Sequence, residues 1–278
     1  MNKLQQEPIP EFAQDFSNKY KKGKELAQGK NLCIVSLARD VGDVLEQNLN
    51  TIRQLGNYFQ SFKHFIYEND STDSTVDILT KWSEASPNNI LLSEKLDAPA
   101  FGQSTDNQRI KTMAYGRNKC VDFVKEQEDV DLVLVVDLDF IEMNLEGIYN
   151  TLGWMDNSPY INGMAGFSYH NRVQPLPEGM VTKDKILTNY DSWAYRHNCW
   201  TDLYSAGQMY WFWWWIPAYG TVPFTVNSAF GGSCLYDAKA FIEGVYTDKD
   251  CEHVTFHHDL KQKSNFNLFV NPSQTMLV

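Results

Sequence analysis

Short apolar strands alternate with amphipathic helices through the first half of this 278-residue chain, and that alternation constrains the fold more than any other feature. The pattern predicts strands at residues 31–37, 62–67, 89–93 and 132–136, with apolar residues at helical spacing between them. Consecutive parallel strands need crossover connections, which are right-handed in nearly all known sheets. The chain is therefore predicted to be an α/β protein with a doubly wound, mostly parallel sheet.

The remaining sequence divides into a lead-in and a second half. Residues 1–30 are polar with aromatic residues spaced by four, which predicts a helix packed on the main body. We expect residues 31–278 to form a single domain, with a regular half at 31–140. Its irregular second half, 141–278, is rich in aromatic residues.

Composition excludes several classes of protein. Lys and Arg number 24 against 35 Asp and Glu, so the net charge of −11 argues against an extended nucleic-acid surface. No apolar run reaches the roughly 18 to 20 residues of a membrane span, and residues 1–12 lack the apolar region of a secretory signal. The five cysteines have no metal-binding spacing. We expect a cytoplasmic protein with reduced thiols, and peripheral contact with the inner face of a membrane is left open.

An acidic pair, Asp137 and Asp139, follows directly after the strand at 132–136. Residues i and i+2 of a strand project to the same side, and their carboxylates suit a hard cation such as Mn²⁺ or Mg²⁺. The alternative is a solvated pair that only ends the strand. Because ligands of doubly wound sheets bind at the carboxyl ends of strands, we favour a metal site.

A second acidic segment, with Glu68 and Asp70, follows the strand at 62–67. A carboxylate at a strand end can accept hydrogen bonds from a ribose hydroxyl or a base edge. The alternative is a loop whose only role is to cap the next helix.

Two arginines, Arg109 and Arg117, belong to the long helix predicted before the acidic pair. Arg117 lies on an otherwise apolar stripe, so its guanidinium must pair with a buried carboxylate or with a phosphate of a ligand. The sequence alone does not separate those two roles.

The densest group of titratable residues is the segment Glu252, His253, His257 and His258. A helix there stacks His253 over His257, and a neutral imidazole can complete a metal shell that two aspartates begin. Glu252 can act as a general base. The alternative is a solvated helix face that carries histidines flanked by acids.

An aromatic run at residues 210–217 includes Trp213 and Trp214. Flat aromatic faces bind sugar rings, but aromatic residues are also the usual filling of a core. Both interpretations stay open for this run.

Taken in order, these motifs resemble the GT-A-fold glycosyltransferases, and more narrowly the fungal capsule-associated α-1,3-mannosyltransferase group with related bacterial and viral sequences. The similarity covers about residues 31–272. The segments that carry it are 67–75, Arg109 to Arg117-Asn118, 137–139, Tyr190-Asp191-Ser192-Trp193, 226–236, 251–253 and 269–272.

The resemblance implies a role for each segment. Residues 31–140 would bind a nucleotide-sugar donor and 141–278 would hold the acceptor and complete the catalytic site. The implied donor-binding residues are Glu68, Asp70, Arg109, Arg117 and Asp137. The implied metal ligands are Asp139 and Asp137 with His257 or His258. Glu252 would be a catalytic base or an acceptor-orienting residue, and Asp139 is the second implied catalytic residue. The implied acceptor-binding residues are Tyr190, Asp191, Trp193, Trp213 and Trp214.

The resulting functional hypothesis is a metal-dependent hexosyltransferase. It would move a sugar from a UDP- or GDP-linked donor to a hydroxyl of a glycan or glycolipid in surface polysaccharide synthesis, with Mn²⁺ or Mg²⁺ as cofactor. A nucleotidyltransferase that makes an activated sugar is one alternative, although the loop at 38–43 is too acidic to cradle a triphosphate comfortably. A non-catalytic glycan-binding protein on the same fold is the other, and the intact acidic pair argues against it.

Overall fold

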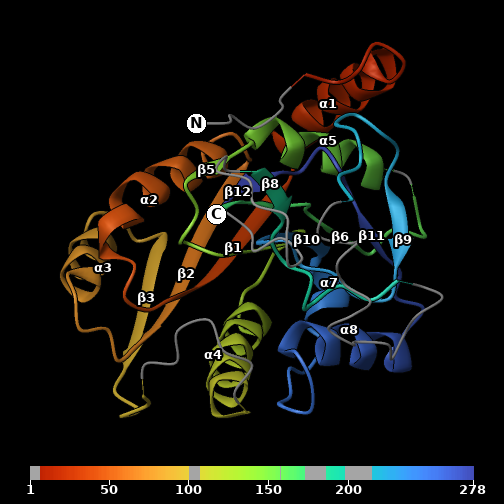
Figure 1. Cartoon of the computed structure of the whole chain (residues 1–278). Helices are drawn as coiled ribbons and strands as arrows, with labels where there is room; N and C mark the ends of the chain where they lie inside the picture. Colours follow the sequence, from red (N-terminus) through yellow and green to blue (C-terminus); the bar gives the residue numbers. More distant parts are fainter. Residues whose placement is uncertain (1–6, 100–106, 157, 173–185, 198–214) are drawn as a thin grey trace.

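The central sheet combines strands from both halves of the sequence (Figure 1). The computed structural model describes residues 7–99, 107–156, 158–172, 186–197 and 215–278. Within these residues the strand order of the eight-stranded sheet is β3-β2-β1-β4-β10-β6-β11-β9. The strands are β1 Asn31–Ala38, β2 Ser61–Asn69, β3 Asn89–Glu94, β4 Leu132–Val136, β6 Gly163–Ala165, β9 Phe224–Val226, β10 Ser233–Asp237 and β11 Leu268–Val270.

Helices cover both faces of this sheet, as the alternating pattern predicts. The helices are α1 Ala13–Ala27, α2 Gly42–Gly56, α3 Thr75–Glu84, α4 Asn107–Lys125, α5 Leu145–Met155, α7 Ala238–Phe241 and α8 Glu252–Lys263. Residues of β1 alternate between two cores: Cys33 and Val35 face α4 and α8, whereas Leu32 and Ile34 face α2, α3 and α5. In Figure 1, α4 and α8 lie on the same side of the sheet.

Strands β3, β2, β1 and β4 are mutually parallel, so their carboxyl ends meet at one edge. The predicted doubly wound, mostly parallel sheet is confirmed in this half. In the second half, β10 runs antiparallel to β4 and β6, and β9 runs antiparallel to β11. A smaller sheet has the order β5-β12-β7-β8, with strands β5 Glu142–Met143, β12 Met276–Leu277, β7 Tyr169–Arg172 and β8 Ile186–Asn189.

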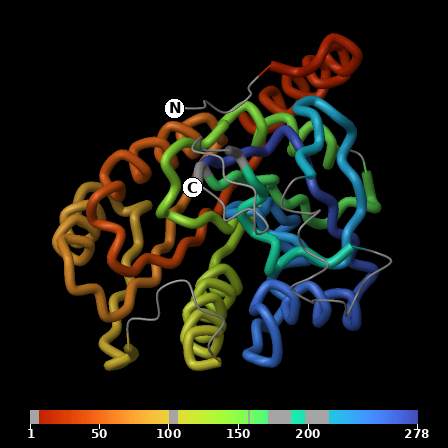
Figure 2. Tube along the Cα trace, viewed as in Figure 1, coloured from red at the N-terminus to blue at the C-terminus, as the bar shows by residue number. Residues whose placement is uncertain are grey.

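Helix α5 is not among the elements predicted from the sequence. Its residues from Gly147 to Gly153 are all buried, including the polar Asn150 and Thr151. Helix α1 lies beside it (Figure 2), although the two are far apart in the chain. A Cβ at Gly153 would lie 1.9 Å from the carbonyl oxygen of Lys19, so glycine is required at this crossing.

The cysteines that the structure describes are reduced. Cys33, Cys120, Cys234 and Cys251 are buried free thiols, and Cys199 lies outside the described residues.

Across the described ranges, none of the helices combines the length and the apolar character that a bilayer crossing requires.

A buried histidine in β2 makes stability depend on pH. His64 contacts the Ser36 hydroxyl at 3.1 Å, and burial lowers its pKa from 6.5 to about 3. Between these values the unfolded chain binds a proton that the folded chain does not, so the free energy of unfolding falls as the pH is lowered. We expect His64→Gln to weaken that dependence by up to roughly 1 kcal/mol per pH unit. Urea unfolding at pH 6.5 and pH 5 measures it, and equal slopes for both proteins would contradict a neutral His64.

Candidate active site

The acidic pair lies in a tightly held turn after β4. The backbone N–H of Asp137 still donates to the carbonyl oxygen of Gly232, at 2.9 Å. From α2, the buried amide of Asn48 donates to the carbonyl oxygens of Leu138 and Phe140, at 2.8 and 2.7 Å. These bonds fix the turn so that Leu138 and Phe140 are buried, while Asp137 and Asp139 lie at the carboxyl edge of the sheet.

Arg117 holds the first of these carboxylates. Its Nη2 lies 2.8 Å from Asp137 Oδ1, and only 1% of the arginine is exposed. The guanidinium also lies over the ring of Phe230, 5.1 Å from its centre. Burial opposes the charge on Arg117, but Asp137, together with Tyr246, Glu252 and Cys120, outweighs that effect and raises the arginine pKa. Of the two roles that the sequence leaves open, the structure therefore places Arg117 in an ion pair with the acidic turn.

Asp139 is the more open member of the pair. Protein atoms crowd its carboxylate although the residue keeps exposed surface, and this loss of water, together with the charge of Asp137, raises its pKa to about 6. A cation between the two carboxylates would relieve their repulsion. In the part of the chain that is described, no three His, Cys, Asp or Glu side chains converge to hold a metal ion alone. The pair therefore suits a cation that takes its other ligands from water and a bound diphosphate.

A pocket of about 250 Å³ opens beside Asp137, with α4 and α8 on its walls. Glu252, the first residue of α8, is only 2% exposed within it. Burial raises the pKa of Glu252, while the charge of Arg117 works in the opposite direction. The pocket is lined by Arg109, Met113, Arg117, Asp137, His170, Tyr190, Asp191, Trp193, Phe230, Cys251, Glu252 and His253.

The segment predicted to bind the acceptor lines the same pocket. Asp191 accepts hydrogen bonds from the backbone N–H groups of Gly231, at 2.9 Å, and Ala194, at 3.2 Å. Burial raises the pKa of Asp191 to about 6 against the effect of those bonds. Asp191 thus anchors its own loop, which presents Tyr190 and Trp193 to the pocket. Trp213 and Trp214 lie outside the described residues.

The three histidines of α8 have separate environments. His257 is fully buried, with Nδ1 at 2.9 Å from the Ser228 hydroxyl and Nε2 at 2.8 Å from the Tyr236 hydroxyl. Both of its nitrogens are thus occupied inside the core, and burial lowers its pKa to about 3. His258 is exposed and does not line the pocket, whereas His253 does. The structure therefore does not bring the expected metal ligands His257 and His258 to the acidic pair.

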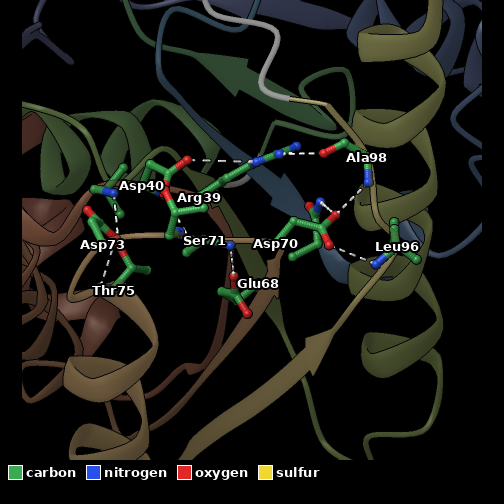
Figure 3. A network of polar contacts seen from close by, with 12 residues as sticks. Arg39, Asp40, Glu68, Asp70, Ser71, Asp73, Thr75, Leu96 and Ala98 are labelled. Atoms are coloured by element: carbon green, nitrogen blue, oxygen red, sulfur yellow. Dashed lines mark hydrogen bonds and ion pairs between the residues drawn. The ribbon is translucent and has the colours of Figure 1, made fainter.

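A second, larger pocket of about 630 Å³ lies at the carboxyl ends of β1, β2 and β3. Asp70 is central to it (Figure 3): its Oδ1 accepts the N–H groups of Leu96 and Asp97, and its Oδ2 accepts that of Ala98. Burial works to raise the pKa of Asp70, but these bonds and one from Asn69 outweigh it and lower the pKa. The φ angle of Asp70 is 56°, in the left-handed region. Its carboxylate shapes the loop after β3 and so forms a wall of the pocket.

Further hydrogen bonds join the ends of β1, β2 and β3 and the loops that follow them around the same pocket (Figure 3). Asp40 Oδ1 accepts the N–H of Thr72 at 2.6 Å, and Arg39 donates to the carbonyl oxygen of Ala98 at 2.6 Å. Glu68 is buried, where it accepts from the Ser71 N–H at 2.8 Å and from the Ser93 hydroxyl. Glu68 and Asp70, the predicted nucleoside-binding residues, thus hold the surrounding loops in a hydrogen-bonded cup and are not free carboxylates.

Several pocket residues carry no signal that marks them individually in the sequence. His170 on β7 meets the ring of Tyr190 edge-on, with ring centres 4.6 Å apart. Phe230 lies under both Arg117 and the ring of His253. Each comes from the irregular half of the chain, where long-range strand pairing decides which side chains meet.

No family model matches this sequence, and no curated protein matches it. Among solved structures, the chain is similar to GalNAc-T7 with UDP, GalNAc and Mn²⁺, at a TM-score of 0.53 and 12% identity over 98% of this chain and 53% of that chain. It is also similar to S. aureus TarS 1–349 in complex with UDP-GlcNAc, at a TM-score of 0.50 and 12% identity over 89% of this chain and 58% of that chain. This chain thus spans little more than half the length of those two.

At such identity the comparisons establish the fold alone. The narrower resemblance to the fungal capsule-associated group stays a prediction. The order of the strands and the similarity to these structures over most of the chain show that it has the GT-A fold.

Proposed function

We propose that this protein is a metal-dependent glycosyltransferase that moves a hexosyl group from a UDP- or GDP-linked donor to a hydroxyl group. The observation that carries the proposal is the crowded carboxylate of Asp139 beside Asp137, at the carboxyl edge of the sheet, where Asp137 lines the smaller pocket. A glycan or glycolipid in surface polysaccharide synthesis is the acceptor that we propose, and the cytoplasm is the proposed location.

Asp139 and Asp137 would hold the Mn²⁺ or Mg²⁺ ion. Asp137 keeps one oxygen for this role, because Arg117 contacts only Oδ1. When bound, such an ion neutralises the charge that develops on a departing diphosphate. Without a cation, the two carboxylates would repel the diphosphate of the donor.

The donor would lie along the carboxyl edge of the sheet. Its nucleoside would occupy the cup around Asp70 and Glu68, and its diphosphate would lie near the acidic turn. Arg109 lines the pocket beside Asp137 and is the arginine that we assign to the donor. Arg117 would act indirectly, by fixing the position of Asp137.

The acceptor would enter the smaller pocket, where Tyr190 and Trp193 offer aromatic faces to a sugar ring. In an inverting reaction, the Glu252 carboxylate takes the proton of the acceptor hydroxyl. The acceptor oxygen then bonds to the anomeric carbon, and the bond from that carbon to the diphosphate oxygen breaks. In a retaining reaction the departing phosphate can take the proton, and Glu252 orients the acceptor. The anomeric proton coupling of the product distinguishes the two outcomes.

Donor binding tests this proposal before any acceptor is known. We expect one UDP- or GDP-sugar to raise the unfolding temperature only when Mn²⁺ is present, because ligand at 100 times its Kd stabilises the folded state by about 2.7 kcal/mol. The measurement is a thermal-shift panel of UDP-, GDP-, CDP- and dTDP-sugars with Mn²⁺ or with a chelator. Equal shifts after chelation would reject the metal role. Release of pyrophosphate from a nucleoside triphosphate would instead favour a nucleotidyltransferase.

A further inference from the structure

Glu252 is contacted by both of its neighbours in the chain, one on each carboxylate oxygen. The thiol of Cys251 donates to Oε2, with Sγ at 3.7 Å, and the Nε2 of His253 lies 3.5 Å from Oε1. All three residues are 2% exposed and line the same pocket. This arrangement depends on the helix start, because Cys251 has a non-helical backbone at the N-cap (φ −45°, ψ 130°) and Glu252 is the first helical residue.

The imidazole of His253 cannot turn away from this contact. Its ring is stacked on Phe230, with centres 3.8 Å apart and planes 13° apart, and the ring of Tyr246 meets it edge-on at 5.6 Å. Both ring nitrogens are buried without a hydrogen-bond partner in the described chain, so the approach of Nε2 to Oε1 is a close polar contact and not a formed hydrogen bond. Burial, and then the charge of Arg117, lower the pKa of His253, so the ring is neutral. A neutral imidazole with its proton on Nε2 can donate to a carboxylate.

The thiol of Cys251 provides the matching contact on the other oxygen. Burial raises the pKa of Cys251 well above its usual value, so the sulfur carries a proton to donate. A thiol is a weak donor, and its contribution is therefore smaller than that of the imidazole.

We propose that Cys251 and His253 are positioning residues that hold the Glu252 carboxylate in one orientation toward the acceptor. This inference rests on the proposed function, in which Glu252 removes the acceptor proton or orients the acceptor. Neither neighbour touches the substrate. Both act by limiting the rotation of the Glu252 side chain within the pocket.

Paired substitutions test the inference. The measurement is kcat with the nucleotide sugar that the thermal-shift panel identifies as the donor. We expect His253→Leu to lower kcat roughly tenfold and His253→Gln, which keeps an N–H donor, to lower it less than about threefold. Cys251→Ala is expected to cost about threefold, and Cys251→Ser to stay near wild type. The KM for the donor stays unchanged in all four variants. Cys234→Ala and His64→Gln remove an equally buried thiol and imidazole elsewhere and serve as controls.

A positioning role also predicts that the effects are not additive. In a Glu252→Gln background, His253→Leu is expected to cause no further loss, because the group that it positions has been removed. Equal losses for His253→Gln and His253→Leu, or a raised donor KM with unchanged kcat, would overturn the inference while leaving the transferase in place. Wild-type turnover of Glu252→Gln would overturn both the positioning role and the assignment of Glu252.

Discussion

Asp139→Asn is expected to lower turnover by roughly 10²- to 10³-fold, because it removes the exposed carboxylate that would hold the cation against the donor diphosphate. An amide has the same shape but no charge, so the turn that Asn48 fixes stays intact. Turnover with saturating donor and Mn²⁺ measures the effect. Near-native activity of the variant would remove the main support for the metal site.

The folded state should tolerate this substitution. The raised pKa of Asp139 means that the stability gained from its neutral form is full below pH 3.8 and is lost as the pH rises through about 6. Above pH 7 the variant is therefore expected to unfold at a temperature no lower than that of the wild type. Asp122→Asn, at an exposed position on α4, is a matched control for both turnover and unfolding.

The largest loss of stability is expected for Arg117→Met. This change leaves Asp137 without its cation in a half-buried position, and breaking a buried pair from one side costs about 3–5 kcal/mol. Because 21% of the Asp137 side chain is exposed, we expect a decrease of about 2–4 kcal/mol in the free energy of unfolding. Urea unfolding measures the decrease, and activity is expected to fall with it because Asp137 loses its fixed position.

A double variant distinguishes loss of the pair from simple damage to the core. Arg117→Met combined with Asp137→Asn leaves no uncompensated charge and is expected to recover stability to within about 1 kcal/mol of the wild type. Turnover should not recover, since a carboxylate of the acidic turn is then missing. A direct interaction would be contradicted if the double variant lost as much stability as Arg117→Met and Asp137→Asn lose together as single variants.

Sequence reasoning located the acidic residues well, because strand ends are local features. The turn at Asp137 and Asp139 and the loop at Asp70 follow runs whose apolar character already predicts buried strands. Parallel strands then bring both to one edge, as β1, β2 and β4 do here. The same reasoning could not decide what Arg117 pairs with, since a buried guanidinium can form an ion pair with either a carboxylate or a phosphate.

The histidines of α8 show where local reasoning ends. Helical spacing relates His253 to His257, but it does not say which one faces a pocket and which one faces the core. Strand β10 settles this, because its Tyr236 hydroxyl occupies one nitrogen of His257. The irregular half is governed by such long-range pairings, which also bury the polar Asn150 and Thr151 of α5.

By itself, the order of residues determined the α/β architecture and the acidic groups placed at the carboxyl edge of the sheet, since both follow from hydrophobic period and strand ends. Only the tertiary structure decided that Arg117 belongs to Asp137, that Asp70 holds a loop and that Glu252 lies between Cys251 and His253 in a pocket. The physical reason is that burial and partner choice depend on atoms far apart in the chain, which no local pattern specifies.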